Sequence, residues 1–223
     1  MCRARRGFEV SDLQQTIFGQ AEIVGCRHQR MADDYYPTPE GITRALIDRV
    51  VISGTIFECC AGHGAIADVL ASTERIILQS DLSWPSPNGE LRDAIEPRFW
   101  ESWTLPSSGG IPVDWTVTNP PFCEAEQILP LAWEHSRRGY AFLLRLSYLE
   151  PTAGRADWLN VTADHLRHLI PVNPRPKFRR DVGGTDSVTA AWFVWEKNWS
   201  WQDKGIQCPC LFVSGWQQFS DSL

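Results

Sequence analysis

The stretch that decides the fold is Thr55-Ile56-Phe57-Glu58-Cys59-Cys60-Ala61-Gly62-His63-Gly64. Its first half is an apolar run with the length of a strand, and its glycines mark a tight turn. Residues 65–70 are then predicted to form a helix, and residues 75–81 are a second apolar run that ends on Asp81. A strand, a glycine turn, a helix and another strand make a βαβ unit with a right-handed crossover. The stretch therefore predicts an α/β fold.

Further apolar runs along the chain repeat this alternation of strands and helices. Apolar residues recur at helical spacing over 42–50, after a proline-set segment in which Thr38 is placed to cap a helix beginning at Pro39. The segment 75–81 has the continuous apolar character of a strand that is covered on both faces. The other predicted strands are 113–118, 139–146, 165–172 and 187–195, and the other helices are 89–103 and 124–138. This order favours an α/β sandwich with a mostly parallel sheet.

The composition is typical of a globular domain. A chain of 223 residues can bury one full core, and 43% hydrophobic with 22% charged residues excludes the disordered and fibrous classes. No apolar run reaches the roughly 20 residues of a membrane helix, and the first residues lack a signal-peptide core. We therefore expect a cytoplasmic protein with no membrane partner.

Charge and proline patterns divide the chain into three parts. Residues 1–33 carry five arginines and no sustained apolar period, so we expect a peripheral arm. Residues 34–197 hold the α/β domain. Residues 198–223 are expected to form a tail that packs on this domain.

The seven cysteines are odd in number and irregularly spaced, unlike the framework of a secreted disulfide-rich protein. We interpret them as reduced thiols. Cys208 and Cys210 are separated by one proline, but a zinc site needs four ligands and a second pair is not visible. The sequence therefore predicts no bound metal.

The glycine turn and Asp81 suit the binding of a nucleoside-containing ligand. Glycines let a ligand approach the backbone, and the following helix offers free N–H groups, although a tight turn also needs glycine for structural reasons. Ala61 stands where a dinucleotide-binding fingerprint has its first glycine, which disfavours pyrophosphate. Asp81 lies at the carboxyl end of the next strand. A carboxylate there can accept hydrogen bonds from both hydroxyls of a ribose, or it can simply cap a loop.

The segment Asn119-Pro120-Pro121-Phe122 follows an apolar strand and carries the sharpest chemical signal. Two prolines fix the backbone, so the Asn119 amide and the Pro120 carbonyl are acceptors with little freedom left to lose. Phe122 adds a flat apolar face. Such a pocket fits a planar ring that bears an exocyclic amine.

These motifs, in this order, resemble the S-adenosylmethionine-dependent DNA N6-adenine methyltransferases, especially compact phage and prophage types. The resemblance covers residues 35–197 and includes the segment Tyr36-Pro37-Thr38-Pro39 and the late motif Arg175-Pro176-Lys177-Phe178. It implies a Rossmann-like class I methyltransferase fold, with a mostly parallel seven-stranded sheet and helices on both faces. It also implies methyl transfer from S-adenosylmethionine to the N6 amine of adenine in DNA.

The resemblance assigns a role to each matching position. The residues implied to bind the cofactor are Tyr36, Thr38, Glu58, Ala61, Gly62, Gly64, Asp81 and Asp93. Glu58 and the turn would surround its methionine portion, Asp81 its ribose, and Asp93 its adenine. The residues implied to be catalytic are Asn119, Pro120, Pro121 and Phe122. Asn119 and Pro120 would accept the two amine protons while Phe122 stacks on a base flipped out of the duplex.

A basic run provides the candidate nucleic-acid contacts. Four cations fall within six residues amid prolines and glycines, namely Arg175, Lys177, Arg179 and Arg180. Such a loop can contact phosphates, although a solvated surface loop has the same composition. The net charge of −6 provides no bulk attraction to a polyanion, so local distribution matters more than the sum. We expect duplex DNA with a flipped adenine as the partner, with RNA as the alternative.

Two other functions compete with this interpretation. The same pocket could accept another planar amine, such as adenine or guanine in RNA, cytosine N4 in DNA, or a glutamine amide in a protein. The chain could also be a catalytically silent nucleic-acid-binding module. The joint presence of Asn119, Pro120, Phe122 and Asp81 argues against the silent module, because a module freed from catalysis has no physical need of all four.

Overall fold

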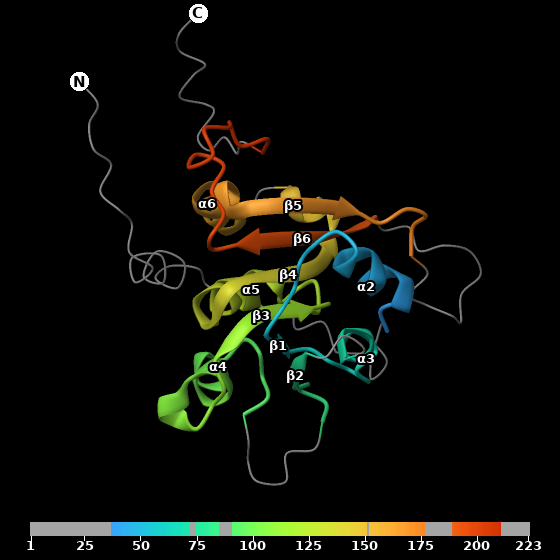
Figure 1. The fold of residues 1–223 in the computed structure, drawn as a ribbon, viewed down its shortest axis with the longest axis vertical. Coiled ribbons are helices and arrows are strands. Elements are labelled where there is room, and N and C mark those ends of the chain that lie inside the picture. Colours follow the sequence, from blue (N-terminus) through green and yellow to red (C-terminus); the bar gives the residue numbers. More distant parts are fainter. Residues whose placement is uncertain (1–36, 72–74, 85–90, 151, 177–188, 211–223) are drawn as a thin grey trace, which may run out of the picture.

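Six strands form one sheet in the computed structural model, in the order β2-β1-β3-β4-β6-β5 (Figure 1). The structure describes residues 37–71, 75–84, 91–150, 152–176 and 189–210. The implied sheet of seven strands is therefore wrong for the described part of the chain, which contains six. The strands are β1 (Thr55–Glu58), β2 (Ile76–Gln79), β3 (Val113–Thr118), β4 (Ser136–Arg145), β5 (Leu166–Pro171) and β6 (Ala190–Glu196).

The sheet is mixed, with one strand running against the other five. β1 pairs in parallel with β2 and β3, and β3 pairs in parallel with β4. β6 lies antiparallel between β4 and β5, and its arrow points the opposite way to that of β5 in Figure 1. The expected mostly parallel character is thus present, and the carboxyl ends of β1 to β4 lie at one edge of the sheet.

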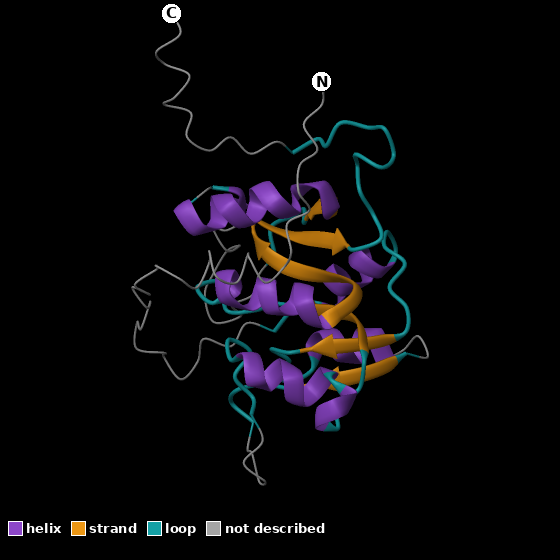
Figure 2. Cartoon of the chain, turned by 90° about the vertical axis from the view of Figure 1, so that its left-hand side faces the viewer, coloured by secondary structure: helices purple, strands orange, loops and turns teal. Residues whose placement is uncertain are grey.

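Helices cover both faces of the sheet, as Figure 2 shows from the side. The helices are α2 (Glu40–Ile47), α3 (Ala65–Ala71), α4 (Pro97–Thr104), α5 (Ala125–His135) and α6 (Ala153–Thr162). One buried cluster contains apolar residues of α2 and α3, and a second contains those of α4, α5 and α6. Neighbouring residues of a strand reach different clusters, because strand side chains alternate between faces: Ile56 belongs to the first cluster and Phe57 to the second.

Two local predictions need correction. β2 is covered only in part: Ile77 and Leu78 are half-buried against clusters on opposite faces, but Ile76 is 60% exposed, and in the described part of the chain β2 pairs only with β1. An edge strand in this position has less neighbouring structure to cover it. Thr38 does not cap α2 either, since the helix begins at Glu40 after Pro39 without a side-chain cap. The Thr38 hydroxyl instead accepts a hydrogen bond from Asn119 Nδ2.

The last described residues contact the beginning of β5. The Trp201 indole donates to the Leu166 carbonyl at 3.0 Å, and the Cys208 thiol donates to the Ala163 carbonyl at 3.3 Å. Residues 1–36 and 211–223 lie outside the described residues, so the division into arm, domain and tail stays a prediction. Among the described helices, none combines the length and apolar character needed to cross a bilayer.

Gly139 provides a test of how closely β4 and β6 pack. It pairs with Glu196, and a Cβ atom at this position would lie 2.2 Å from the Trp195 carbonyl oxygen. Because that oxygen belongs to the neighbouring backbone, we expect Gly139→Ala to destabilise the fold by about 2 kcal/mol or more. Gly41→Ala is the control: nothing lies within 4 Å of its Cβ position in α2, and we expect a gain of about 0.5 to 1 kcal/mol. Urea unfolding measures both, and equal effects would contradict the packing at Gly139.

Candidate active site

Many of the predicted site residues lie where the parallel strands end. From β1 the chain passes to β2 on one side, and it then returns to form β3 on the other side. In an open α/β sheet, a crevice forms outside the carboxyl ends of the strands at such a reversal. Glu58 ends β1, Thr118 ends β3 and Arg145 ends β4, so the glycine turn and the Asn119 segment begin at neighbouring positions of this edge.

Backbone hydrogen bonds hold the glycine turn against the end of β2. Ala61 N donates to the Ser80 carbonyl at 2.9 Å, and Gly64 N donates to the Ala61 carbonyl at 2.8 Å. Gly62 and Gly64 have φ angles of 54° and 81°, in the region that favours glycine. The two glycines are thus required by the backbone of the turn itself.

Asp81 fastens this turn from the neighbouring strand. Its Oδ2 accepts from Gly62 N at 2.7 Å, and its Oδ1 accepts from Ser83 N at 2.9 Å. The Ser83 hydroxyl donates to the same Oδ1, and the Trp84 indole donates to the Gly62 carbonyl at 2.6 Å. Asp81 therefore binds the backbone N–H of Gly62, and Trp84 binds its carbonyl. An ionised carboxylate offers about four acceptor sites, so these three bonds leave Asp81 capacity for a further donor.

Glu58 lies beneath the turn rather than beside it. The residue is 1% exposed, and its Oε2 accepts from Ala67 N at 2.9 Å, in the first turn of α3. Burial raises the pKa of Glu58 well above its usual range, and the nearby Asp68 and Asp81 carboxylates raise it further, while the bond from Ala67 opposes them. Glu58 therefore ties α3 to the end of β1 in an environment that penalises its negative charge.

A hydrogen bond links the proline-set segment to the Asn119 segment. Asn119 Nδ2 donates to Thr38 Oγ1 at 3.1 Å, across 81 residues of sequence. Thr38 is 5% exposed, whereas Asn119 is half-buried. Because the amide nitrogen is directed toward Thr38, the amide oxygen is directed away from it. Thr38 thus sets the orientation of the Asn119 side chain.

Phe122 presents an aromatic ring next to Asn119. Pro120 is buried, Pro121 is exposed, and Phe122 is half-buried against the cluster that also packs α4, α5 and α6. The Arg145 guanidinium lies over the ring, with its Cζ 4.9 Å from the ring centre. The sequence prediction missed Arg145, although a lone cation at the carboxyl end of a buried strand was the signal that could have found it.

The other predicted residues are not brought to this edge by a described contact. Asp93 lies between β2 and α4, where its Oδ1 accepts from Ile95 N at 3.2 Å. Arg175 is exposed near the end of a described range. Tyr36, Lys177, Arg179 and Arg180 lie outside the described residues. Trp84, which the sequence prediction also missed, is an aromatic residue three positions after Asp81.

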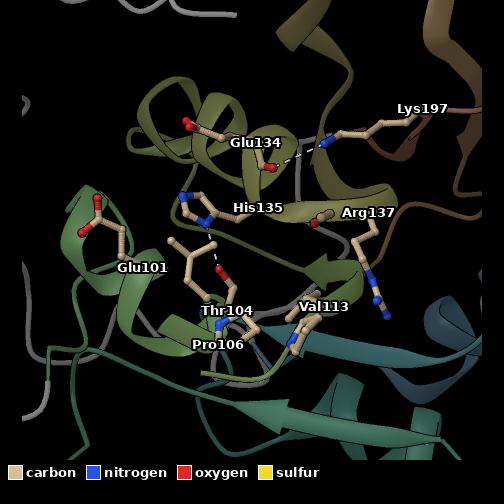
Figure 3. A pocket seen from close by; sticks show the side chains of 11 residues that line it. Glu101, Thr104, Pro106, Val113, Glu134, His135, Arg137 and Lys197 are labelled. Atoms are coloured by element: carbon tan, nitrogen blue, oxygen red, sulfur yellow. Dashed lines mark hydrogen bonds between the residues drawn. The ribbon is translucent and has the colours of Figure 1, made fainter. Parts of the chain in front are cut away.

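A cavity of about 360 Å³ lies elsewhere, near the amino ends of β3 and β4. Figure 3 shows His135 turned toward Thr104 and the Lys197 amine directed at the Glu134 carbonyl. The Thr104 hydroxyl donates to the Trp100 carbonyl at 2.7 Å, so it accepts from His135 Nδ1 at 2.8 Å. Burial lowers the pKa of His135, which favours its neutral form. None of the predicted site residues lines this cavity.

Cysteines and acidic side chains give no metal centre in the described part of the chain. No group of three or more His, Cys, Asp or Glu side chains there could hold a metal ion. The described cysteines are free thiols. Cys59 and Cys60 adjoin the glycine turn with their sulfurs 3.9 Å apart, and hydrogen bonding to Cys59 together with burial raises the pKa of the Cys60 thiol.

Comparisons with known proteins match the fold but not the sequence. No family model and no curated protein matches the chain. Its structure is similar to the modification subunit of a putative type I restriction enzyme from Vibrio vulnificus YJ016, with 13% identity and a TM-score of 0.50. That match covers 76% of this chain and 46% of the other. The similarity shows a shared fold.

Two further solved structures belong to type I restriction-modification systems. The methyltransferase subunit from Streptococcus thermophilus has 12% identity and a TM-score of 0.45, over 73% of this chain and 45% of its own. A structure of the type I restriction-modification system, described for its assembly and conformational transition, has 14% identity and a TM-score of 0.49. This match covers 74% of this chain and 43% of the other. The chain therefore spans less than half the length of each of these three structures.

The buried carboxyl of Glu58 predicts a pH-dependent gain of stability in Glu58→Gln. The pKa of Glu58 is higher in the folded protein than in the unfolded chain, where it is about 4.5. Below that pH the carboxyl is neutral in both states, so its burial costs the wild type no unfolding free energy through ionisation. As pH rises above that value, the unfolded carboxyl ionises first and the wild type loses stability. A neutral Gln can still accept from Ala67 N, so its stability relative to the wild type should increase from pH 4 to pH 7. Urea unfolding at both values measures this difference.

The control variant is Glu58→Ala, which removes the acceptor as well as the charge. It should be less stable than Glu58→Gln at every pH, because Ala67 N loses its partner. A difference in unfolding free energy between Glu58→Gln and the wild type that stays constant with pH would contradict the raised pKa of Glu58.

Proposed function

We propose that the chain transfers a methyl group from S-adenosylmethionine to the N6 amine of adenine in DNA. The observation that carries this proposal is the placement of Asn119, whose amide is oriented by Thr38 at the carboxyl edge beside the glycine turn. The fold shared with a type I modification subunit supports DNA as the substrate. The resemblance of residues 35–197 to N6-adenine methyltransferases supports adenine as the target.

The residues of the edge fit S-adenosylmethionine in their chemistry. Asp81 has acceptor capacity left for one ribose hydroxyl, and the glycines of the turn carry no side chain of their own that would keep a ligand from the backbone. Glu58 lies under the turn and would favour a cationic ligand above it, because a positive charge lowers the cost of its own ionisation. The cofactor would supply an activated methyl group on a positively charged sulfur.

The Asn119 segment would act by positioning the target amine. The Asn119 amide oxygen and the Pro120 carbonyl would accept the two protons of the amine, which favours a pyramidal nitrogen and directs its lone pair. The acceptors are neutral and the prolines hold them in place, so the contribution is positioning and electrostatics rather than removal of a proton. Phe122 would stack on a base that has left the duplex.

Parallel transfer of labelled methyl groups to several acceptors tests the proposal. Duplex DNA, single-stranded DNA, RNA and total protein are each incubated with the protein and methyl-labelled S-adenosylmethionine, and mass spectrometry identifies the modified nucleoside. We expect N6-methyladenine in DNA. Label in RNA, as N4-methylcytosine, or in protein would move the activity to one of the other planar amines. Cofactor binding with no label in any acceptor would favour a silent module.

Asn119→Ala should abolish most methyl transfer without disturbing the fold. Loss of one preorganised hydrogen-bonding group in an active site lowers kcat by about 100- to 1000-fold. We expect that loss with unchanged thermal unfolding and unchanged cofactor affinity. The matched control is Asn160→Ala on the exposed side of α6, which should keep full activity. A failure of Asn119→Ala to fold would make Asn119 structural instead.

Thr38→Val tests whether Thr38 acts through Asn119. The valine keeps the shape of the side chain but removes the hydroxyl that accepts from Asn119 Nδ2, so the amide loses its preferred orientation. We expect kcat to fall about tenfold with little change in the Kd of the cofactor, since one hydrogen bond is lost. Thr38→Ser retains the hydroxyl and should stay close to the wild type. A weaker cofactor Kd with unchanged kcat would show that Thr38 binds the cofactor directly.

A further inference from the structure

Arg145 is a cation beside the proposed base pocket that the assigned roles do not use. It ends β4, and its guanidinium carbon lies 4.9 Å from the centre of the Phe122 ring. At this distance a guanidinium is attracted to the negative face of an aromatic ring. The Arg145 side chain is exposed, whereas the ring beneath it is half-buried. The guanidinium therefore covers the ring on the side of the solvent.

The charge of Arg145 has no carboxylate partner in the described part of the chain. Other described arginines do pair with acids, namely Arg44, Arg49, Arg137, Arg138, Arg155 and Arg167. Arg155 shows the contrast, because it pairs with Glu126 and also donates to the Glu150 carbonyl at 2.8 Å. Arg145 makes neither kind of contact with any residue that the structure describes. Its charge is thus available to an anionic ligand.

The packing of Phe122 decides where a base could stack. The ring packs against the buried cluster that contains Phe57 and Tyr140. The exposed Arg145 guanidinium lies over a face of the same ring. A base that stacks on this face must therefore take the place of the guanidinium. Stacking of a base on an aromatic ring is stronger than an exposed cation–π contact, so the exchange is favourable.

We propose that Arg145 covers the stacking face of Phe122 in the free protein and moves to a phosphate of the target strand when the base enters. This inference rests on the proposed function, because it requires a nucleotide base on Phe122. Arginine suits both positions: its plane stacks on a ring, and its N–H donors match the oxygens of a phosphate. The displaced guanidinium needs a new anionic partner, and the nucleotide that displaces it brings one.

The test measures binding of single-stranded oligodeoxyadenosine in the presence of S-adenosylhomocysteine. An oligonucleotide of about 12 residues covers one binding site of a single-strand-binding surface. It needs no recognition sequence, and its bases enter a pocket without the cost of leaving a duplex. A central 2-aminopurine reports stacking through quenching of its fluorescence. The proteins are the wild type, Arg145→Ala, Arg145→Lys and the control Arg49→Ala, which removes an exposed arginine from the turn that follows α2.

We expect Arg145→Ala to weaken binding and to reduce its salt dependence. Loss of one phosphate contact lowers the slope of log K against log salt by about 0.7 for a single strand, and the affinity by roughly threefold to tenfold near 0.1 M salt. Arg145→Lys keeps the charge and should keep the slope. Quenching of 2-aminopurine should persist in Arg145→Ala, because the Phe122 ring stays uncovered. Arg49→Ala should match the wild type.

An unchanged salt slope in Arg145→Ala, or an equal loss in Arg49→Ala, would overturn the inference. A wild-type protein that does not bind the oligonucleotide would also overturn it. Thermal unfolding of each variant confirms that the comparison is between folded proteins. Failure of the proposed function is seen separately, as the absence of N6-methyladenine in DNA treated with the wild type. The binding test uses no methyl transfer, so the two failures are distinguishable.

Discussion

Burial of the central strands on both faces is the constraint from which the site follows. Ile56 and Phe57 point into different clusters, and Trp192 and Phe193 of β6 do the same. A sheet of this kind needs helices on both faces, and parallel neighbours need a crossover between strands. Each crossover leaves the sheet at the carboxyl edge. The glycine turn after β1 and the Asn119 segment after β3 are the first residues of two such crossovers, so the packing of the core places them side by side.

Hydrogen bonds to side chains then give this edge a definite geometry. Asp81 and Trp84 bind the backbone N–H and carbonyl of Gly62, so the residues after β2 determine the position of the turn after β1. Thr38 performs the equivalent role for Asn119. In both cases a residue from a different connection holds the functional group. An edge built in this way is preorganised, which lowers the cost of positioning a ligand.

Local sequence signals predicted the strands but not the contacts between distant segments. Each of the six strands lies on an apolar run, because burial on both faces leaves a continuous apolar signal. The same signal failed to show that β2 is half-exposed, since position in the sheet depends on pairing. α6 was missed because, among its apolar residues whose burial is described, only Trp158 and Leu159 are well buried. The expectation of a seventh strand rested on the resemblance alone. The bond between Thr38 and Asn119 spans 81 residues, and local capping preferences predicted a different partner for Thr38.

The described ionisable groups at the carboxyl edge favour a proposed chemistry that depends on neutral acceptors. Glu58 accepts from Ala67 N in an environment that raises its pKa, and Asp81 accepts one hydrogen bond from the glycine turn and two from Ser83. His135, a partly buried histidine with a lowered pKa, lines the cavity near the amino ends of β3 and β4. The carboxylates thus build the edge. In the proposed function, the Asn119 amide and the Pro120 carbonyl would contact the substrate, and neutral acceptors would suffice for an amine whose proton becomes acidic only after methylation. Positioning would then take the place of a general base.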